Sequence, residues 1–298
     1  MTESTALRAL GILRGEPLVR LMGRLRQGDV ALEDDLHEME HAASLLALAA
    51  PPVDPPAILK RRVLSRAASE GYYFLPERLS EWEPAMTRVS SGGAMGAVAA
   101  GAAISGAWVR RLFIHARESH EARLVRLMPS APAAALAQLT GAGFYVLSGD
   151  LHVDGERLDM GDWYGANGEP PSGRTDMGCV LFTVLSGAAS RGRSRARTIV
   201  RAADGAWTEE APGVASKRLG EDAEHGLRAS LVRMEPGAGW PAHRHEGAEE
   251  LFVVRGDWRC LGTTLRPGDY HRAGSGTEHE TTTSAHGCKL IVVRHTVE

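Results

Sequence analysis

Four side chains near the C-terminus have the types and the spacing of a metal site. His243 and His245 stand two residues apart, so on a strand both imidazoles point to the same face. Glu249 follows after a Glu-Gly pair that favours a bend, and His279 comes after another glycine-rich turn. Three imidazoles and one carboxylate suit a divalent zinc, iron, manganese, cobalt or nickel ion. We therefore expect these four residues to hold one divalent metal ion per chain, inside a small β-barrel near residues 230–298.

Two neighbouring side chains are rival ligands. Glu250 is the rival carboxylate, but it breaks the spacing to Gly256 and would point to the opposite face from Glu249. His271 is a rival fourth imidazole, which we expect in the barrel wall or behind a ligand rather than on the metal. The remaining alternative is that all the candidate ligands are solvated surface residues.

An internal repeat places the four residues in the second of two related segments. The sequence RRLFIHARESHEARLVRLMP (110–129) aligns with KRLGEDAEHGLRASLVRMEP (217–236), at an offset of 107 residues. The same offset pairs Gly149 with Gly256, each at the end of a β-prone run. A repeat of this length predicts two copies of one β-domain.

The first copy lacks the side chains of the metal site. The positions that correspond to the four candidate ligands cannot bind the ion in the same way, because they are Leu136, Gln138, Ala142 and Ser172. The first copy is therefore expected to be a metal-free barrel with a more apolar interior. Its histidines form no spaced set, and we expect ordinary loop or strand positions for His115, His120 and His152.

The region before the repeat has a helical pattern. Apolar residues recur there at spacings of three and four, which predicts amphipathic helices. The run PPVDPP (51–56) breaks the third helix and opens a fourth over residues 57–68. From Tyr72 onward, short β-prone runs are divided by Gly, Pro and Asp. The prediction is therefore one helical domain and two β-domains, at residues 1–69, 70–187 and 188–298.

Composition limits the function classes. A net charge of −3 and the absence of a Lys/Arg run argue against direct nucleic-acid binding. Residues 92–109 carry no charge, but they are almost all Ala and Gly, so we expect a loop insertion in the first copy and not a membrane span. Residues 1–15 lack the apolar core of a secretory signal. The cysteines form no CxxC, which favours a reducing cytoplasm: they are Cys179, Cys260 and Cys288.

The spacing of the candidate ligands resembles the two motifs of the cupin family. Residues 237–256 read G-x5-H-x-H-x3-E-x6-G, and residues 268–279 read G-x5-G-x-G-x2-H. The second motif departs from the family pattern at Gly274, where proline is usual, and at Thr283, where asparagine is frequent. Neither departure touches a ligand. The resemblance implies a double-stranded β-helix barrel of the jelly-roll type with a metal ion bound inside.

The whole layout resembles the ChrR type of anti-sigma factor. The string ASLLALAAPPVDPPAILKRRVLSRAA (43–68) is similar to the N-terminal domain of bacterial anti-sigma factors. The segments APGVASKRL and LVRMEPGAGWPAHRHEGAEELFVVRGD resemble ChrR-like cupins more than other cupins. The fold class implied is mainly β, with an N-terminal α-helical domain followed by two tandem cupin barrels.

The helical domain departs from the zinc-binding members of this group. Those members carry a His-x3-Cys-x2-Cys signature, whereas this chain has His37-x3-His41-x2-Ser44 and no cysteine in the domain. The two histidines share a helix face and are a candidate chelating pair, although we expect solvated residues. The resemblance therefore implies a helical domain of the zinc-free kind.

The resemblance implies an anti-sigma factor that sequesters a sigma factor of the extracytoplasmic-function (ECF) type. Release would be controlled by the metal-binding cupin, with zinc as the first choice of metal, on sensing an oxidant or small molecule. We expect a cytoplasmic regulator without membrane or direct nucleic-acid contact; a homodimer through the cupin domains stays open. The alternative is a cupin metalloenzyme of dioxygenase or isomerase type, whose helices form an oligomerisation arm. Its candidate pocket residues are Trp240, Tyr270 and His271.

Overall fold

The computed structural model describes residues 71–86, 102–115, 120–129, 131–136, 139, 142–165, 172–185, 198–222 and 226–295, with isolated positions between residues 6 and 39. The chain divides into two compact units, Met1–Ala57 and Ile58–Glu298. Nearly all of the predicted helical domain, residues 1–69, lies outside the described residues, as do His37, His41 and Ser44. That domain stays a prediction, and the fold described below is that of the second unit.

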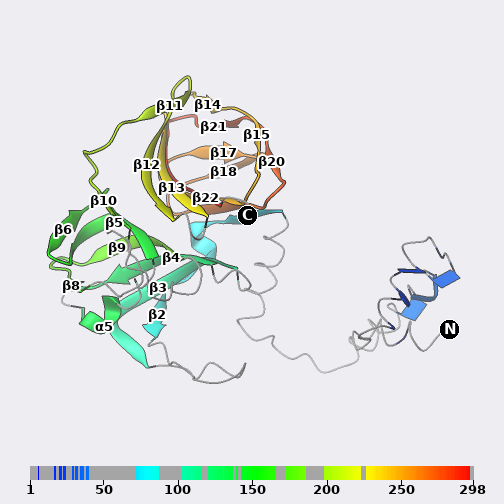
Figure 1. Ribbon diagram of the computed structural model, residues 1–298, viewed down its shortest axis with the longest axis horizontal. Helices are drawn as coiled ribbons and strands as arrows, with labels where there is room; N and C mark the ends of the chain where they lie inside the picture. The colour runs from blue at the N-terminus through cyan, green and yellow to red at the C-terminus, as the bar shows by residue number, and fades with distance from the viewer. Residues whose placement is uncertain are drawn as a thin grey trace. The chain divides into compact units, whose positions relative to one another are not determined.

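Two large antiparallel sheets dominate the second unit (Figure 1). The C-terminal one has seven strands in the order β1-β19-β16-β22-β13-β12-β11. Its strands are β1 (Tyr72–Leu75), β11 (Thr208–Ala211), β12 (Val214–Asp222), β13 (Leu227–Met234), β16 (Glu249–Gly256), β19 (Tyr270–Ala273) and β22 (Cys288–His295).

A smaller sheet and one strand pair complete the C-terminal β-unit, the name used here for β1 and β11–β22. The smaller sheet has the order β14-β21-β17-β18, and β15 pairs with β20. Trp240 and Trp258 from the smaller sheet share a buried core with Val232 and Leu290 from the larger one. These strands are β14 (Gly239–Trp240), β15 (His243–Arg244), β17 (Trp258–Cys260), β18 (Thr263–Leu265), β20 (Glu278–His279) and β21 (Thr282–Thr283).

The other large sheet forms the N-proximal β-unit. Its path is β10-β7-β5-β9-β4-β3-β2, and β6 and β8 also pair with β5. A 3-10 turn, η1 (Glu77–Leu79), and a one-turn helix, α5 (Ala133–Leu136), accompany the strands. The strands are β2 (Glu83–Met86), β3 (Ala103–His115), β4 (His120–Leu127), β5 (Ala142–Val153), β6 (Glu156–Asp159), β7 (Trp163–Gly165), β8 (Gly173–Arg174), β9 (Cys179–Leu185) and β10 (Thr198–Val200).

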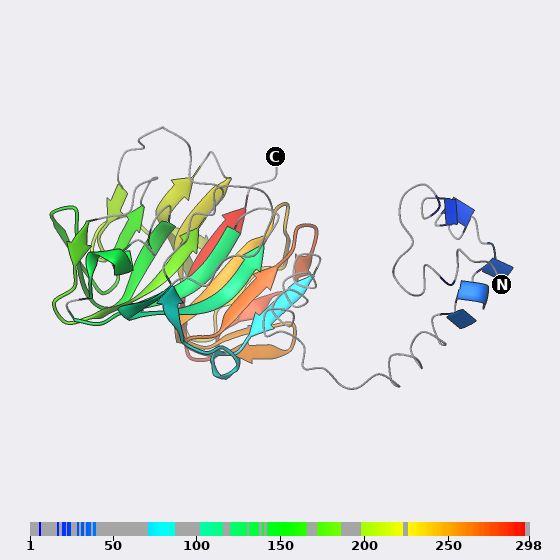
Figure 2. The same cartoon turned by 90° about the horizontal axis from the view of Figure 1, so that it is seen from below.

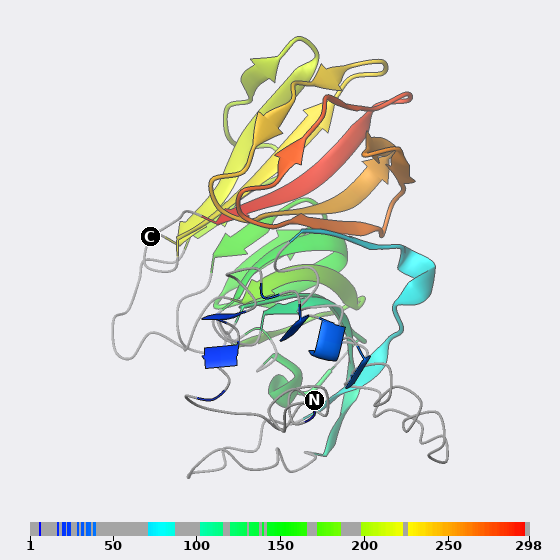
Figure 3. The ribbon, with the colours of Figure 1, turned by 90° about the vertical axis from the view of Figure 1, so that its right-hand side faces the viewer.

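Strands aligned by the sequence repeat take equivalent places in the two large sheets. The orders β7-β5-β9-β4-β3-β2 and β19-β16-β22-β13-β12-β11 correspond strand by strand. The edge strands are exchanged: β1 precedes the first copy but pairs with β19, and β10 precedes the second copy but pairs with β7. Figure 3 shows the cyan segment of β1, η1 and β2 passing from one β-unit to the other. Each large sheet therefore takes one of its two edge strands from the other copy.

Equivalent hydrogen bonds secure both exchanged strands. After β1, the Glu77 amide donates to Asp269 Oδ1 at 2.7 Å, and after β10 the Ala202 amide donates to Asp162 Oδ1 at 2.7 Å. Asp162 and Asp269 are related by the repeat offset and open equivalent strands, β7 and β19. Each exchanged strand is thus held on its sheet by an equivalent amide–carboxylate hydrogen bond.

Two buried cations at repeat-related positions add to this attachment. Arg110 is 2% exposed and donates to Ser80 Oγ at 2.5 Å and to Glu77 Oε1 at 3.1 Å, both in the segment after β1, as well as to the Gly268 carbonyl at 3.0 Å. Lys217 is 2% exposed, and its Nζ donates at 2.8–3.1 Å to the carbonyls of the turn after β10. A buried cation is stable only when its donors are satisfied, so each of these side chains depends on the exchanged segment for its partners.

One apolar core lies between the two large sheets, whose long strands run side by side in Figure 2. Phe182 and Phe252 meet there with ring centroids 5.2 Å apart. Trp163 fills space that two glycines leave open: a Cβ would lie 2.4 Å from its ring at Gly143 and 2.7 Å at Gly220. The two β-units are therefore packed against each other as tightly as a domain interior.

The expectation of a loop insertion over residues 92–109 is wrong for the C-terminal part of this range. Strand β3 begins at Ala103, so residues 103–109 are strand and pair with β2 and β4. Ile104 and Val109 are buried in the core of the N-proximal β-unit. The Ala/Gly-rich composition concealed these strand positions, because small residues give little hydrophobic alternation. Among the described residues, no helix is long and apolar enough to cross a membrane.

Candidate metal centre

The structure brings the four predicted residues together inside the C-terminal β-unit. One ring nitrogen of each histidine and one carboxylate oxygen of Glu249 all lie within 4.8 Å of one another. His243 and His279 are directly opposite on the β15–β20 pair, and Glu249 opens β16. His245, Glu249 and His279 are buried, whereas the His243 side chain is 30% exposed. The set is thus enclosed, with one ligand candidate at its mouth.

Backbone contacts hold the loops that carry these residues. The His245 amide donates to the Thr277 carbonyl at 2.9 Å, and the Gly276 amide donates to the His245 carbonyl at 2.8 Å. Between the two motif histidines and Glu249, Gly247 passes so close to β22 that a Cβ there would lie 1.7 Å from the His295 carbonyl oxygen. Glycine at this bend lets the chain bring Glu249 back toward the histidines.

The hydrogen bonds of His243 and His245 fix which ring nitrogen faces the centre. His243 Nδ1 lies 2.9 Å from the Pro241 carbonyl, which accepts only, so Nδ1 carries the hydrogen. Thr277 Oγ1 donates to the Gly274 carbonyl at 2.6 Å and therefore accepts from His245 Nδ1 at 3.0 Å. In both rings, Nε2 is left as the nitrogen available to a metal ion.

A chain of hydrogen bonds fixes His279 in the same way. His271 Nδ1 donates to the Tyr73 carbonyl at 3.0 Å, so His271 Nε2 accepts from His279 Nε2, also at 3.0 Å. Burial, with the nearby His279, lowers the pKa of His271 to about 3, and burial, with the nearby His245, lowers the pKa of His279 to about 4. Both rings are therefore neutral at pH 7, and His279 Nδ1 faces the centre with a free lone pair.

Arg294 holds the carboxylate of Glu249 from outside. Its Nε donates to Glu249 Oε2 at 2.8 Å, while Oε1 lies 3.5 Å from His245 Nε2 and 4.0 Å from His279 Nδ1. Burial alone would raise the pKa of Glu249, but His243 and His245 in their protonated forms, together with Arg294, outweigh it and keep the pKa well below its ordinary value. The carboxylate is thus ionised, with Oε1 turned toward the imidazoles.

These atoms fit a divalent transition metal ion. His243 Nε2, His245 Nε2 and His279 Nδ1 are buried and have no hydrogen-bond partner among the residues that the structure describes. Three imidazole nitrogens with free lone pairs and one ionised carboxylate form a donor set. Zinc, iron, manganese, cobalt and nickel bind such donors in proteins. Nearby Glu249 raises the pKa of His243, so an incoming ion has to displace a proton there at lower pH. The cluster and its fold indicate a metal-binding site.

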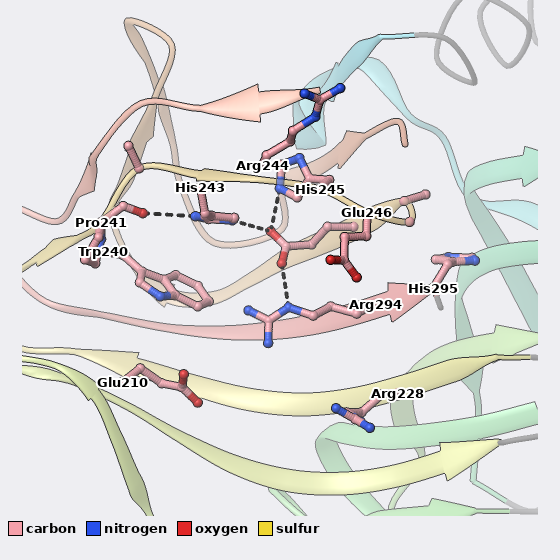
Figure 4. Close-up of a pocket in the computed structure, with 14 residues that line it drawn as sticks. Glu210, Arg228, Trp240, Pro241, His243, Arg244, His245, Glu246, Arg294 and His295 are labelled. Atoms are coloured by element: carbon pink, nitrogen blue, oxygen red, sulfur yellow. Dashed lines mark hydrogen bonds and ion pairs between the residues drawn. The ribbon is translucent and has the colours of Figure 1, made fainter. Parts of the chain in front are cut away.

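A cavity of about 560 Å³ opens onto this centre. Its lining includes Trp240, Arg228 and Arg294 as well as His243, His245 and Glu249. Figure 4 shows the interactions of His243, His245 and Arg294 converging on one carboxylate, that of Glu249. The volume of the cavity lies in the range of pockets that bind small organic molecules. A small molecule therefore has a path to the centre.

Of the three predicted pocket residues, the structure places only Trp240 in this lining. Tyr270 is wrong as a pocket residue, because it is fully buried in the core between the two β-units. His271 lies behind His279, which agrees with the expectation that it stands behind a ligand. Tyr270 and His271 differ in this way because adjacent residues of β19 face opposite sides of the sheet.

A second buried cluster was missed at the level of sequence. His120 Nε2 and His295 Nε2 both contact Glu250 Oε1, the latter at 2.9 Å, and Arg272 Nε lies 3.8 Å from it. Burial would raise the pKa of Glu250, but contacts with the two histidines hold it well below its ordinary value. The two histidine contacts are of hydrogen-bond length, and Arg272 adds a permanent cation 3.8 Å away, so we interpret the cluster as a buried charged network around Glu250 rather than a metal site. No spacing pattern in the sequence relates His120 to Glu250, since they belong to different copies.

The first copy has other side chains at the positions of the candidate ligands. Leu136 is buried in the core of the N-proximal β-unit, and Ser172 Oγ is 3.2 Å from Asp154 Oδ1. Gln138 lies outside the described residues. His152, expected to be ordinary, lies 3.0 Å from Asp176 and 3.6 Å from Asp150, in a partly exposed group. Amides from residues 176 and 177 already bind Asp150, which makes this group a turn rather than a ligand set.

Comparisons with known proteins place the fold. A putative glyoxylate-induced protein from Pseudomonas aeruginosa matches with a TM-score of 0.55 and 14% identity, over 83% of this chain and 95% of that one. A putative dioxygenase from Nostoc punctiforme matches with a TM-score of 0.56 and 13% identity, over 78% and 90%. At these identities the likeness concerns the fold alone.

Two further comparisons concern only part of the chain. A chain from the complex of Rhodobacter sphaeroides SigE with the anti-sigma ChrR is 26% identical over 32% of this chain and 50% of that one, but its TM-score of 0.28 is too low to compare folds. No curated protein matches the sequence. The family described as the ChrR cupin-like domain matches residues 195–298. The segment that carries all four candidate ligands is therefore similar to the ChrR cupin-like domain, and it has a cupin-type fold.

Proposed function

We propose that this chain is an anti-sigma factor of the ChrR type. Residues 1–69 hold an ECF-type sigma factor, and the C-terminal cupin controls its release on sensing an oxidant or small molecule. The observation that carries the proposal is the convergence of His243, His245, Glu249 and His279 within a segment similar to the ChrR cupin-like domain. The resemblance of residues 43–68 to anti-sigma N-terminal domains supports it.

The proposal includes two tandem cupin barrels, only the second of which holds the metal. The strand-by-strand equivalence of the two large sheets supports the tandem arrangement, and Leu136 at a ligand position supports a metal-free first barrel. The domain limits remain those predicted from sequence, with β1 and β10 exchanged between the barrels. We propose zinc as the ion because three nitrogen donors and a carboxylate suit it.

The protein's own residues prepare the site for a small ligand. Hydrogen bonds keep His243, His245 and His279 in the tautomers that face the centre, and Arg294 keeps Glu249 ionised. When bound, the metal ion supplies a Lewis-acidic centre at the end of the cavity. A ligand controls release only if it interacts differently with the sigma-bound and sigma-free states.

The test measures sigma binding by the full chain. ECF-type sigma factors from the same genome are mixed with the protein, and complexes are resolved by size-exclusion chromatography. A complex with at least one sigma factor is expected, and it should be lost when residues 1–69 are deleted. The His243→Ala variant should still bind the sigma factor but no longer respond to the releasing agent. Absence of any complex, together with unchanged sigma-dependent transcription in a deletion strain, would overturn the proposal.

The second candidate is a cupin metalloenzyme of dioxygenase or isomerase type. The cavity of about 560 Å³ that reaches His243 and Glu249 favours it, because substrate pockets have this size. The helices would then be an oligomerisation arm. Iron or manganese in the purified protein, with turnover of a small organic substrate, would select the enzyme. Tightly held zinc without turnover would select the regulator.

A further inference from the structure

Strand β1 contacts the metal centre from outside the ligand set. The Phe74 ring stacks on His271 with centroids 4.3 Å apart, and the Tyr72 ring stacks on His279 at 5.8 Å. Tyr72 Oη also donates to the Glu278 carbonyl and accepts from the Glu278 amide, the residue just before His279. Two side chains of one short strand therefore clamp the rings and the backbone on the His279 side of the site.

The backbone of β1 takes part as well. The Tyr73 carbonyl accepts from His271 Nδ1, and this bond makes His271 Nε2 the acceptor for His279 Nε2. Without the Tyr73 carbonyl, His271 is free to take the other tautomer, and His279 is then free to turn Nδ1 away from the centre. Thus β1 fixes the tautomer of a candidate ligand through one intervening ring.

The position of β1 in the chain gives this contact a consequence. The strand is the first described element after residues 1–70, which include the predicted sigma-binding helices. It is an exchanged edge strand of four residues that pairs only with β19 within the described part of the chain. Edge strands with one partner open more readily than central strands. Anything that pulls on the preceding segment therefore acts on β1 first.

We propose that docking of β1 on β19 and metal binding at His243, His245, Glu249 and His279 strengthen each other, so that β1 connects the metal centre to the N-terminal segment. His271 and Tyr72 are positioning residues in this arrangement. The inference rests on the proposed metal site and names the route by which the proposed regulation travels. Linkage is reciprocal: the factor by which docked β1 tightens metal binding is the factor by which the metal ion holds β1 in place.

Strand β10 is a matched control within the same chain. It is the repeat-related exchanged strand and pairs with β7 in the same way, but it contacts none of the candidate metal ligands in the described structure. Ile199 takes the place in β10 that Phe74 takes in β1, and it packs against the apolar core of the N-proximal β-unit. A general effect of metal on stability therefore acts on both strands, whereas the proposed linkage acts on β1 alone.

The first experiment is amide hydrogen exchange on the full chain, with and without zinc. Zinc is expected to slow exchange in peptides covering β1 by about 10- to 100-fold, the range by which outer contacts tune metal affinity, and to leave β10 unchanged. Equal slowing of both strands, or no slowing of β1 in protein that binds zinc, would overturn the inference while leaving the metal site intact. Failure of the wild type to bind zinc or any other divalent ion would remove the metal site itself.

The second experiment measures zinc affinity by competition with a chromophoric chelator, without any sigma factor. Phe74→Ala is expected to weaken zinc binding by about 10-fold or more, and Ile199→Ala by less than about 2-fold. Tyr72→Phe removes only the hydroxyl bridge to Glu278 and keeps the packing of the ring. It therefore tests whether β1 contributes to zinc affinity in a variant with little change in packing. Equal zinc affinities for Tyr72→Phe, Phe74→Ala and the wild type would contradict the proposal.

Discussion

Glu249 and Glu250 are neighbours on β16, and their carboxylates lie in two different buried sites. Glu249 faces the imidazoles of the candidate metal centre, whereas Glu250 faces the N-proximal β-unit and contacts His120. Alternation along a strand sends adjacent side chains to opposite faces. Strand β16 therefore joins the metal centre on one face to the interface between the β-units on the other.

Replacing Glu250 should destabilise the protein without removing the metal ion. The carboxylate is fully buried and faces His120, His295 and Arg272. Glu250→Ala leaves these groups without their counter-charge, so the free energy of unfolding should fall by about 3–5 kcal/mol. Urea unfolding measures this change, and elemental analysis should still find the metal. The exposed Glu246→Ala is the control; loss of metal from a Glu250→Ala protein that is still folded would contradict the separation of this carboxylate from the metal centre.

Replacing Arg294 should weaken metal binding without abolishing it. The guanidinium holds Glu249 Oε2 at 2.8 Å and leaves Oε1 for the metal. Loss of such an outer contact costs about 10- to 100-fold in metal affinity, so Arg294→Ala should show this change in a chelator competition assay. Arg244 also lines the cavity, but its side chain is 70% exposed and lies 3.8 Å from Glu278. Arg244→Ala should therefore be close to wild type, and equal losses in both variants would contradict the role of Arg294.

Asp257 should account for part of the loss of stability in acid. Burial would raise its pKa, but hydrogen bonds from the Ala285 and His286 amides outweigh burial and lower the pKa below its ordinary value of 3.8. The ionised form therefore stabilises the folded state above pH 3.8, and this contribution is lost as the pH falls through the folded pKa. In urea unfolding from pH 2 to 6, Asp257→Asn should be less stable at pH 6 and should lose less stability in acid. The exposed Glu235→Gln should follow the wild-type curve; parallel curves for wild type and Asp257→Asn would refute the assignment.

Lys217 should be needed to keep β10 on the N-proximal sheet. Its buried ammonium group donates to three carbonyls of the turn after β10, at Arg201, Ala202 and Asp204. Lys217→Met removes these three hydrogen bonds, and the loss of each costs about 0.5–1.5 kcal/mol because the turn is partly exposed to water. Limited proteolysis should then cut near residues 198–204 faster than in the wild type. Unchanged protection of this turn would show that strand pairing alone holds β10.

Sequence could predict what depends on spacing within one copy. His243, His245, Glu249 and His279 lie within one repeat, so strand alternation and two glycine-rich turns were enough to bring them together. The buried cluster around Glu250 could not be predicted from sequence. His120 and Glu250 come from different copies, and no spacing rule relates residues of two packed sheets. The exchange of β1 was missed for a similar reason: the repeat offset shows which strands are equivalent, but not which sheet accepts them.

Elemental analysis of the purified full chain tests the metal centre most directly. The wild type and a variant with both His37 and His41 replaced by alanine are compared with His279→Ala, after incubation with zinc and desalting. We expect one zinc ion per chain in the first two proteins and none above background in His279→Ala. Zinc retained by His279→Ala but lost with His37 and His41 would contradict the account, because the ion would then belong to the N-terminal segment and not to the cupin.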